Sequence, residues 1–327
     1  MSKVPVKDWH AYNAAQIYEK TWLILLLSQL CAGIMQPLHT FGRPPVPLGD
    51  VLFAMVLKVY NKTTCRQCIP DLEDAQKRGF ISKVPMPSTI LKYLEMKSTT
   101  RLLRQLIIES SLPLAELETV FAIDSTGLSM SQFDRWIDKR NGKPEVRDRR
   151  SWIKLHVMCG VLTNIVTAVE ISKPTAGDSP FFKALLLTTL RHFRVKEVSG
   201  DKAYSSLKNL LLAWQNKCLP FIPFKSNAKP QHRSKNRLWS RLYYFYSMNA
   251  EWFERHYHKR SNVESTFSMI KRRFDSHLRC RTKTAQVNEA LCKILCHNLC
   301  VIIHSVYERG IEPEFSKDHE ASDNQAA

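Results

Sequence analysis

The pattern of apolar and polar residues over the first 115 residues predicts a series of helices, near 9–36, 48–60, 65–79, 87–96 and 99–110. Between them lie "FGRPPVPLGD", "KTTCRQC" and "KVPMPS", in which proline, glycine and capping residues end one helix and begin the next. We therefore predict a small all-α domain over residues 1–115. Short helices around tight turns are typical of helix-turn-helix DNA-binding domains, and a structural lid or dimerisation domain is the alternative.

From Leu117 the period changes to that of strands. "TVFAIDST", "SWIKLHVMCGV", "NIVTAVEIS" and "VKEVSGD" predict four strands, the second and third joined as a hairpin. "GDSPFFKALLLTTLRHF" predicts a helix with Asp178 or Ser179 as N-cap, and a further helix and a short apolar run follow the fourth strand. The order β-β-β-α-β-α-β-α indicates an α/β fold, a mixed sheet flanked by helices. We assign it to residues 116–310.

The stretch "YHKRSNVESTFSMIK" carries two stripes if it is one continuous helix. Because a helix turns about 100° per residue, Tyr257, Arg260, Glu264 and Lys271 share one face. The apolar residues beside them predict a helix packed on a core along one side; they are Val263, Phe267, Ile270 and Phe274. Taken alone, the polar stripe indicates a surface ion pair between Arg260 and Glu264, contributing about 0.2–0.5 kcal/mol.

Composition adds a strong positive charge. The 327 residues contain 48 Lys plus Arg and 30 Asp plus Glu, a net charge of +18, which favours a polyanionic partner and nucleic acid before a membrane surface. Residues 225–283 hold 15 basic and 4 acidic residues, and residues 139–154 hold 7 and 2. Sequence-independent phosphate contacts are expected, with a solvated basic face as the alternative, from Lys225, Lys229, Arg233, Lys235, Arg272 and Arg273. The acidic segment 311–327 predicts a disordered tail.

Cysteine usage and apolar runs bear on location. The polar N-terminus "MSKVPVKDWH" lacks the features of a signal peptide, and the run "WLILLLSQLCAGIM" is shorter than a membrane span, so we expect a cytoplasmic protein without a membrane partner. Nine cysteines then indicate reduced thiols. Cys65 and Cys68 could form half of a zinc site, but no second pair accompanies them. The role of this pair stays open.

Three carboxylates are candidates for chemistry. Asp124 and Asp201 directly follow predicted strands, and ligand chemistry in α/β sheets collects at the carboxyl ends of strands. Glu264 can join them if its helix packs across the sheet. Converging carboxylates repel one another unless cations neutralise them, and Mg²⁺ prefers such oxygen ligands. A pair of ions about 4 Å apart would suit phosphodiester transfer.

With these residues in place, the chain resembles a known family. The motif Tyr257-x2-Arg260-x3-Glu264-x6-Lys271 fits the Y-R-E-K signature of prokaryotic insertion-sequence transposases of the DDE class. "FAIDST", "WIKLHV" and "VSGDKAYSS" resemble the segments of that family bearing the first catalytic aspartate, the second strand and the second catalytic aspartate. The resemblance spans roughly residues 119–303. It implies a ribonuclease H-like fold, two Mg²⁺ ions with Mn²⁺ as a substitute, and cut-and-join chemistry on DNA.

The resemblance also implies roles for particular residues. Asp124, Asp201 and Glu264 would be catalytic and hold the metal ions, while Tyr257, Arg260 and Lys271 would contact the DNA strand. Element ends and target DNA would be the partners, bound by a homodimer in the synaptic complex. Two alternatives stay open, a ribonuclease H-like nuclease that does not join DNA and a transposase-derived DNA-binding protein without catalysis.

Two neighbouring segments allow more than one interpretation. Lys154 and His156 alternate on the strand "WIKLHV" and could face the site or the DNA, although a hydrogen-bonded structural histidine is the simpler account. The segment "NRLWSRLYYFYSM" interleaves aromatic and basic residues. It could stack on unpaired bases, or its aromatic side chains could pack in the core.

Overall fold

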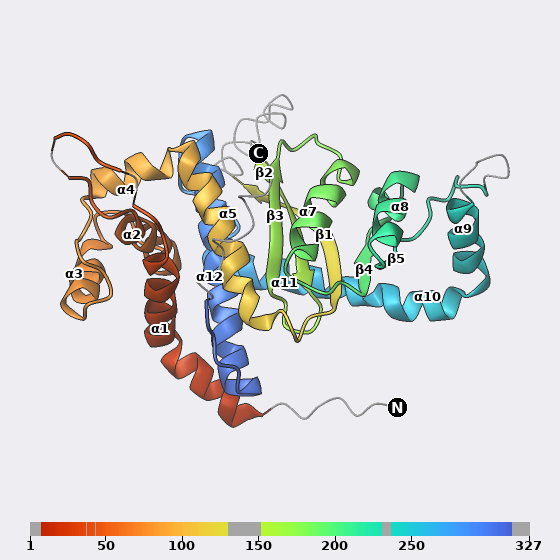
Figure 1. The fold of residues 1–327 in the computed structure, drawn as a ribbon, viewed down its shortest axis with the longest axis horizontal. Coiled ribbons are helices and arrows are strands. Elements are labelled where there is room, and N and C mark those ends of the chain that lie inside the picture. The colour runs from red at the N-terminus through yellow and green to blue at the C-terminus, as the bar shows by residue number, and fades with distance from the viewer. Residues whose placement is uncertain (1–7, 37, 43, 130–151, 231–236, 316–327) are drawn as a thin grey trace, which may run out of the picture. The chain divides into compact units, whose positions relative to one another are not determined.

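The computed structural model describes residues 8–36, 38–42, 44–129, 152–230 and 237–315. Most of the basic run 139–154, the predicted phosphate contacts Arg233 and Lys235, and residues 316–327 of the predicted acidic tail lie outside these ranges. The chain divides into two compact units, one formed by residues 1–113 with 282–327 and the other by residues 114–281. Figure 1 shows the elements of both.

The first unit is helical. It contains α1 (Trp9–Ala32), α2 (Leu48–Tyr60), α3 (Ile69–Lys77), α4 (Pro87–Leu94), α5 (Lys97–Ser111) and α12 (Lys283–Arg309). The apolar run of α2 from Val51 to Leu57 is buried on every side, as expected of a central helix. A buried Asp50 carboxylate accepts hydrogen bonds from the Ser82 hydroxyl and the Lys83 N–H, at 2.7 and 2.8 Å, and so fixes the loop after α3.

The last helix corrects the predicted domain boundary, which placed residues 116–310 in one domain. α12 packs with α1, α2, α4 and α5, so it belongs to the helical unit. It is apolar enough and long enough for a membrane span, but 83% of that stretch is buried in protein, and the side chains of Cys292, Cys296 and Cys300 are buried there. A helix that is apolar all round requires neighbours all round, and four helices of this unit provide them.

The second unit contains the predicted mixed sheet. Its strands are β1 (Val120–Ser129), β2 (Trp152–Gly160), β3 (Val166–Ser172), β4 (Glu197–Gly200) and β5 (Leu219–Phe221), in the order β3-β2-β1-β4-β5. The first three strands are antiparallel neighbours, whereas β4 lies parallel to both β1 and β5. The prediction of a ribonuclease H-like mixed sheet flanked by helices, with a helical segment before it, is confirmed.

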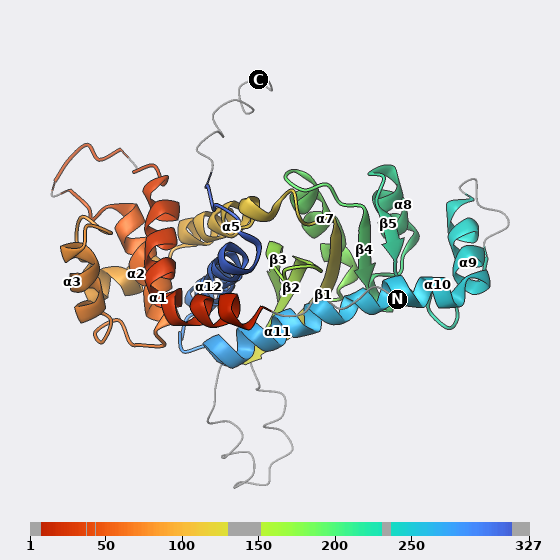
Figure 2. The same cartoon turned by 90° about the horizontal axis from the view of Figure 1, so that it is seen from below.

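Helices cover both faces of this sheet (Figure 2). α7 (Phe182–Leu190) and α8 (Leu207–Gln215) lie over one face, where Phe121 and Ile123 of β1 join the buried cluster. α11 (Ser261–Phe274) packs on the other face against β1 and β2, and it buries Val263, Phe267, Ile270 and Phe274 as its apolar stripe predicts. Because strand side chains alternate, Asp124 points to the α11 face.

The remaining helices extend from the β5 edge. α9 (Leu238–Met248) and α10 (Ala250–Tyr257) lead into a 3₁₀ turn, His258–Arg260, and then into α11 (Figure 2). The predicted continuous helix from Tyr257 to Lys271 is therefore wrong at its start. The 3₁₀ turn separates Tyr257, at the end of α10, from α11, although the Arg260 guanidinium still lies 5.9 Å from the centre of the Tyr257 ring.

Candidate active site

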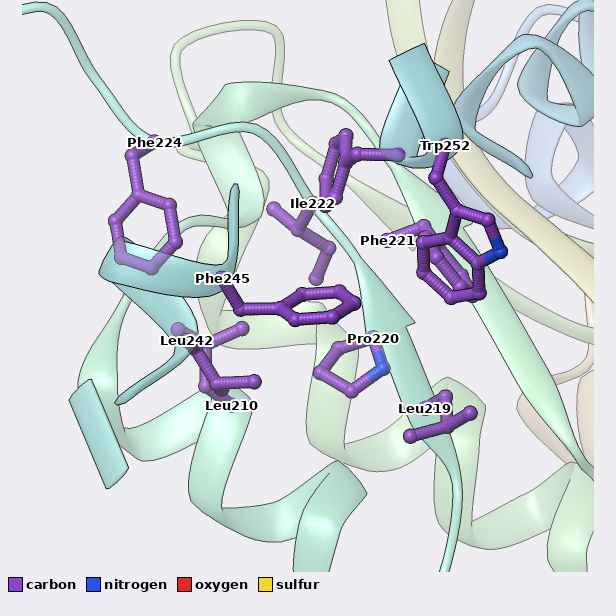
Figure 3. Close-up of a pocket in the computed structure, with 10 residues that line it drawn as sticks. Leu210, Leu219, Pro220, Phe221, Ile222, Phe224, Leu242, Phe245 and Trp252 are labelled. Carbon is purple, nitrogen blue, oxygen red and sulfur yellow. The ribbon is translucent and has the colours of Figure 1, made fainter. Parts of the chain in front are cut away.

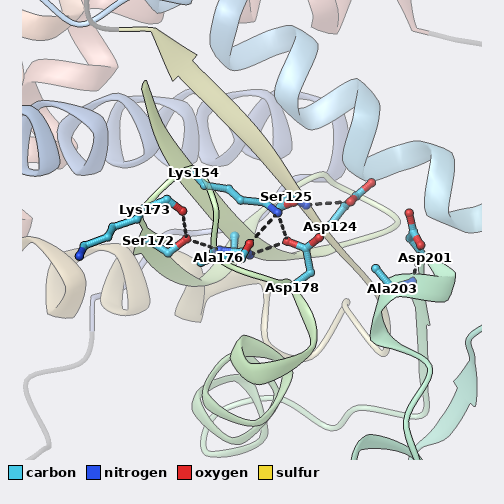
Figure 4. Close-up of polar contacts among 10 residues, drawn as sticks. Asp124, Ser125, Lys154, Ser172, Lys173, Ala176, Asp178, Asp201 and Ala203 are labelled. Atoms are coloured by element: carbon cyan, nitrogen blue, oxygen red, sulfur yellow. Dashed lines mark hydrogen bonds and ion pairs between the residues drawn. The ribbon is translucent and has the colours of Figure 1, made fainter. Parts of the chain in front are cut away.

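Two aspartates stand next to each other where β4 ends beside the middle of β1. The register of β1 and β4 pairs Ile123 with Gly200, so Asp124 and Asp201 are the next pair along. Parallel neighbours lie about 4.8 Å apart, and these two side chains leave the same face of the sheet. Figure 4 shows both carboxyl groups at this end of the sheet. The structure therefore brings together the two aspartates named from the sequence. Asp201 directly follows β4 as predicted, but the prediction that Asp124 also follows a strand is wrong, because β1 continues along β2 to Ser129.

Gly200 makes this close arrangement possible. A Cβ atom on Gly200 would lie 2.8 Å from Cγ2 of Ile123, closer than real Cβ contacts allow. Any larger residue would push β4 away from β1, and Asp201 would move with it. A glycine directly before this aspartate is thus a packing requirement of the site.

Backbone N–H groups hold one oxygen of each aspartate. Asp124 Oδ1 accepts from the N–H of Ser125 at 2.8 Å, and Asp201 Oδ1 accepts from the N–H of Ala203 at 2.5 Å as the N-cap of the 3₁₀ turn Lys202–Tyr204. These contacts fix the carboxyl orientation. The second oxygen of Asp124 contacts Arg260, at the end of the 3₁₀ turn before α11.

Arg260 bridges two of the three carboxylates. Its Nη1 lies 2.6 Å from Asp124 Oδ2, and its Nη2 lies 2.5 Å from Glu264 Oε1. The Arg260–Glu264 surface ion pair predicted from the sequence is therefore accompanied by a second ion pair, between Arg260 and Asp124. Asp124 is largely buried with 17% of its side chain exposed, whereas Glu264 is 58% exposed. Most of the electrostatic stabilisation consequently comes from the Asp124 contact.

The protonation of Asp124 reflects these neighbours. Burial raises the pKa of the Asp124 carboxyl above its ordinary value. The Ser125 N–H and the Arg260 guanidinium oppose that rise, while the negative charges of Asp201 and Glu264 add to it. Since Asp201 and Glu264 both perturb the pKa of Asp124, the three carboxylates form one electrostatic group.

The other motif residues lie around this group. Lys271 Nζ donates to the Thr126 hydroxyl at 2.6 Å, two residues beyond Asp124 on the same strand face, and burial lowers the pKa of Lys271. The Arg260 guanidinium lies 5.9 Å from the ring centre of Tyr257. Of the predicted phosphate contacts, Lys225, Lys229 and Arg272 are exposed and Arg273 is partly buried.

A second polar cluster adjoins the site, and its centre was missed from the sequence. The sequence predicted Asp178 as a helix N-cap, but its side chain makes no capping hydrogen bond. Its Oδ1 instead lies 2.6 Å from Lys154 Nζ and 3.2 Å from His156 Nδ1 (Figure 4). His156 is fully buried, stacks on Phe181 with ring centres 4.0 Å apart, and meets the Ser172 hydroxyl at 2.8 Å. In the sequence, only the aspartate after "TAG" pointed to this cluster, and an aspartate at that position is equally typical of a helix cap.

The aromatic segment near α9 serves mainly in packing. The rings of Trp239, Tyr243 and Tyr246 surround Phe224, with centres 4.8, 5.4 and 5.6 Å away. Beside them is an apolar pocket of about 120 Å³ (Figure 3), lined by residues that include Leu210, Pro220, Phe221, Phe245 and Trp252. Core packing is thus the better account of these three rings.

The donor atoms of the site fit a hard divalent cation. Asp124, Asp201 and Glu264 offer carboxylate oxygens, and the Arg260 guanidinium supplies the positive charge between two of them. Within the described ranges, no three His, Cys, Asp or Glu side chains are already arranged around one point. Glu264 is instead bound to Arg260.

The fold and these carboxylates define a ribonuclease H-like protein with an acidic site on the central strand β1 and at the end of its neighbour β4. A family model described as "Transposase DDE domain" matches residues 115–299, more than half of the chain, and the chain belongs to this family. The family is one of DNA-cleaving enzymes that generally use divalent metal ions.

Among solved structures, the chain is similar to a piggyBac transposase in a synaptic complex with hairpin DNA. The identity is 12%, the TM-score is 0.43, and the match covers 90% of this chain and 77% of that one. No curated protein matches the chain.

Proposed function

We propose that this transposase cuts DNA at the ends of an insertion sequence and joins the 3′-hydroxyl to target DNA. The observation that carries the proposal is the placement of Asp124, within β1, next to Asp201, directly after the parallel strand β4, with Arg260 linking Asp124 to Glu264. The Y-R-E-K spacing supports a prokaryotic insertion-sequence origin. Membership of a DNA-cleaving family and the basic surface around Lys225 and Lys229 support DNA as the partner.

In this proposal Asp124, Asp201 and Glu264 hold two Mg²⁺ ions, or Mn²⁺ in their place. Bound there, the ions would activate a water or 3′-hydroxyl and stabilise the leaving oxygen. The backbone N–H bonds to the two aspartates keep their carboxylates oriented for this task. Arg260, once released from the carboxylates, contacts a DNA phosphate, because a guanidinium matches phosphate and carboxylate geometry alike.

Tyr257 and Lys271 complete the DNA side of the proposed site. Lys271 is held by Thr126 beside Asp124, and Tyr257 lies against the Arg260 guanidinium. A homodimer on paired element ends is part of the proposal, since joining requires two ends in one complex.

The test is strand cleavage and transfer on duplex DNA that carries the inverted repeats flanking the gene, with Mg²⁺ or Mn²⁺. We expect Asp124→Asn, Asp201→Asn and Glu264→Gln proteins to lose both activities. Matched controls are Asp74→Asn and Glu254→Gln, which change exposed carboxylates outside the site and should act as the parent does. Site variants that cut as well as the parent would refute the three-carboxylate proposal.

The same assay separates the alternatives. Cleavage without a joined product would favour a ribonuclease H-like nuclease. Binding of element ends without cleavage would favour a transposase-derived DNA-binding protein.

A further inference from the structure

The 3₁₀ turn His258–Arg260 lies across the two strands that bring the aspartates together. Before it, α10 contacts β5 and β4; the turn itself contacts β4 and β1, and α11 then contacts β1 and β2 (Figure 2). The turn carries Arg260, whose guanidinium binds Asp124, directly after Lys259. The groups that hold this turn therefore set where the Arg260 guanidinium lies.

A further carboxylate on the same face of the sheet binds the turn near the start of β4. The strand register pairs Glu197 with Val120 at that start, four residues before Asp201. Because strand side chains alternate, Glu197 and Asp201 leave the same face of the sheet, to which Asp124 also points. The turn thus meets one acidic group at the start of β4 and another beside its end.

Glu197 holds the turn through two donors that share one carboxylate oxygen. Its Oε2 lies 2.8 Å from Lys259 Nζ and 3.0 Å from His256 Nδ1. The His256 ring stacks on Phe221 of β5 with ring centres 4.5 Å apart, and its centre lies 4.3 Å from that of Trp252. Burial alone would raise the pKa of the Glu197 carboxyl, but the hydrogen bonds from Lys259 and His256 hold that pKa below its ordinary value. The carboxyl group is therefore a charged acceptor.

Local stability alone does not account for this arrangement. The side chains of Glu197 and Lys259 are 19% and 33% exposed, and an ion pair at such exposure adds little stability by itself. Lys259 and Arg260 are neighbours in a three-residue turn, so a backbone shift at one moves the other. The contact of Arg260 with Asp124 is a charge-assisted bond of 2.6 Å, and such bonds weaken steeply with distance and angle. Holding Lys259 at Glu197 thereby keeps the Arg260 guanidinium at its carboxylate.

We propose that Glu197 is a positioning residue that acts on the carboxylate site through Arg260. By binding Lys259 and His256, it fixes the 3₁₀ turn, and the turn fixes the guanidinium against Asp124. That the guanidinium then serves a DNA phosphate rests on the proposed function, whereas its contact with Asp124 does not.

The test is a double-mutant cycle in unfolding equilibrium, measured with urea in EDTA and without DNA. The cycle compares Glu197→Gln, Arg260→Met and the protein that carries both changes. We expect the effect of the double change on the unfolding equilibrium constant to fall about fivefold short of the product of the two single effects, because Glu197→Gln already weakens the Arg260 contact. Independent sites would agree with that product within about twofold.

Matched variants separate positioning from local stability. Lys259→Met should show the same coupling to Arg260→Met, whereas Lys259→Arg, which keeps a cation for Glu197, should unfold like the parent. Glu254→Gln changes an exposed acid that lies 3.7 Å from His258 of the same turn, and its effect should be independent of Arg260→Met. The inference is overturned if the effects of Glu197→Gln and Arg260→Met multiply within about twofold, or if Glu254→Gln couples to Arg260→Met equally strongly.

Strand cleavage separates failure of this inference from failure of the proposed function. We expect Glu197→Gln to cut element-end DNA about ten- to a hundredfold more slowly than the parent, the effect of a displaced active-site group, and Glu254→Gln to cut as the parent does. Independent unfolding effects overturn the role of Glu197 and leave the proposed function intact. Coupled unfolding effects, with parent-like cleavage by both Glu197→Gln and Arg260→Met, overturn the role of Arg260 in the proposed function and leave its positioning by Glu197 in place.

Discussion

Arg260 is expected to act as an internal cation that stabilises the protein when no metal ion is present. The change that tests this is Arg260→Met, which keeps an unbranched apolar stem and removes the charged guanidinium. The contact with Asp124 is a short, mostly buried bond between charged groups, for which about 1.5–3 kcal/mol is typical. The contact with Glu264 is largely exposed and contributes about 0.2–1 kcal/mol.

The expected loss is therefore about 2–3 kcal/mol of unfolding free energy in EDTA. For a unit of this size that corresponds to a fall of about 5–10 °C in melting temperature. Mn²⁺ should then raise the melting temperature of Arg260→Met more than that of the parent, because the ion no longer competes with the guanidinium. Differential scanning calorimetry with and without Mn²⁺ measures both effects.

Arg255→Met is the matched control, since Arg255 is an exposed arginine of α10, one turn before the site. Its melting temperature should equal that of the parent both with and without Mn²⁺. The expected role of Arg260 is refuted if Arg260→Met has the same melting temperature as the parent in EDTA, or if Mn²⁺ raises the melting temperatures of parent and variant equally.

Three further predictions concern stability. Burial lowers the pKa of His156 to about 4 from 6.5, so the folded state binds fewer protons than the unfolded one in that range, and up to about 3 kcal/mol should be lost as the pH falls from 6.5 to 4. Urea unfolding across this pH range should show a smaller loss of unfolding free energy for His156→Gln than for the parent. The exposed control His258→Gln should lose as much as the parent. Gly200→Ala should cost about 1–3 kcal/mol in the same assay, because its Cβ would collide with Ile123; no loss would contradict the packing argument. Asn288→Ala should cost about 1–3 kcal/mol, since Asn288 Nδ2 donates to the carbonyls of Leu94 and Met96 at 2.8 and 3.1 Å between α4 and α5; an unchanged melting curve would show that water replaces it.

Local patterns predicted much of the sheet unit. The β-rich run "VFAID" and the alternation in "IKLHV" predict β1 and β2, because both patterns are visible within a few residues. The apolar stripe of Val263, Phe267 and Ile270 predicts the buried face of α11 for a similar reason, and these residues are buried in the structure. Asp201 was identifiable because it directly follows β4, and Asp124 because the apolar run of β1 is interrupted there, although β1 itself continues to Ser129.

Long-range features could not be predicted in this way. Nothing in the 3₁₀ turn at His258–Arg260 signals a change of helix, since it contains neither proline nor glycine. The pairing of Asp178 with Lys154 depends on how the loop after β3 folds back over β2, which no local pattern encodes. The apolar composition of α12 predicts that the helix is buried, but it does not predict whether the helix packs in the helical unit or in the sheet unit.

The position of α12 has a consequence for the order in which the protein is made. The sheet unit, residues 114–281, is one contiguous stretch, whereas the helical unit combines residues from both ends of the chain. During synthesis α1 to α5 emerge first, yet the helix that fills their core is translated some 170 residues later. We therefore expect the sheet unit to complete its folding first, while the earlier helices wait with apolar surface uncovered and depend on chaperones until the ribosome releases α12.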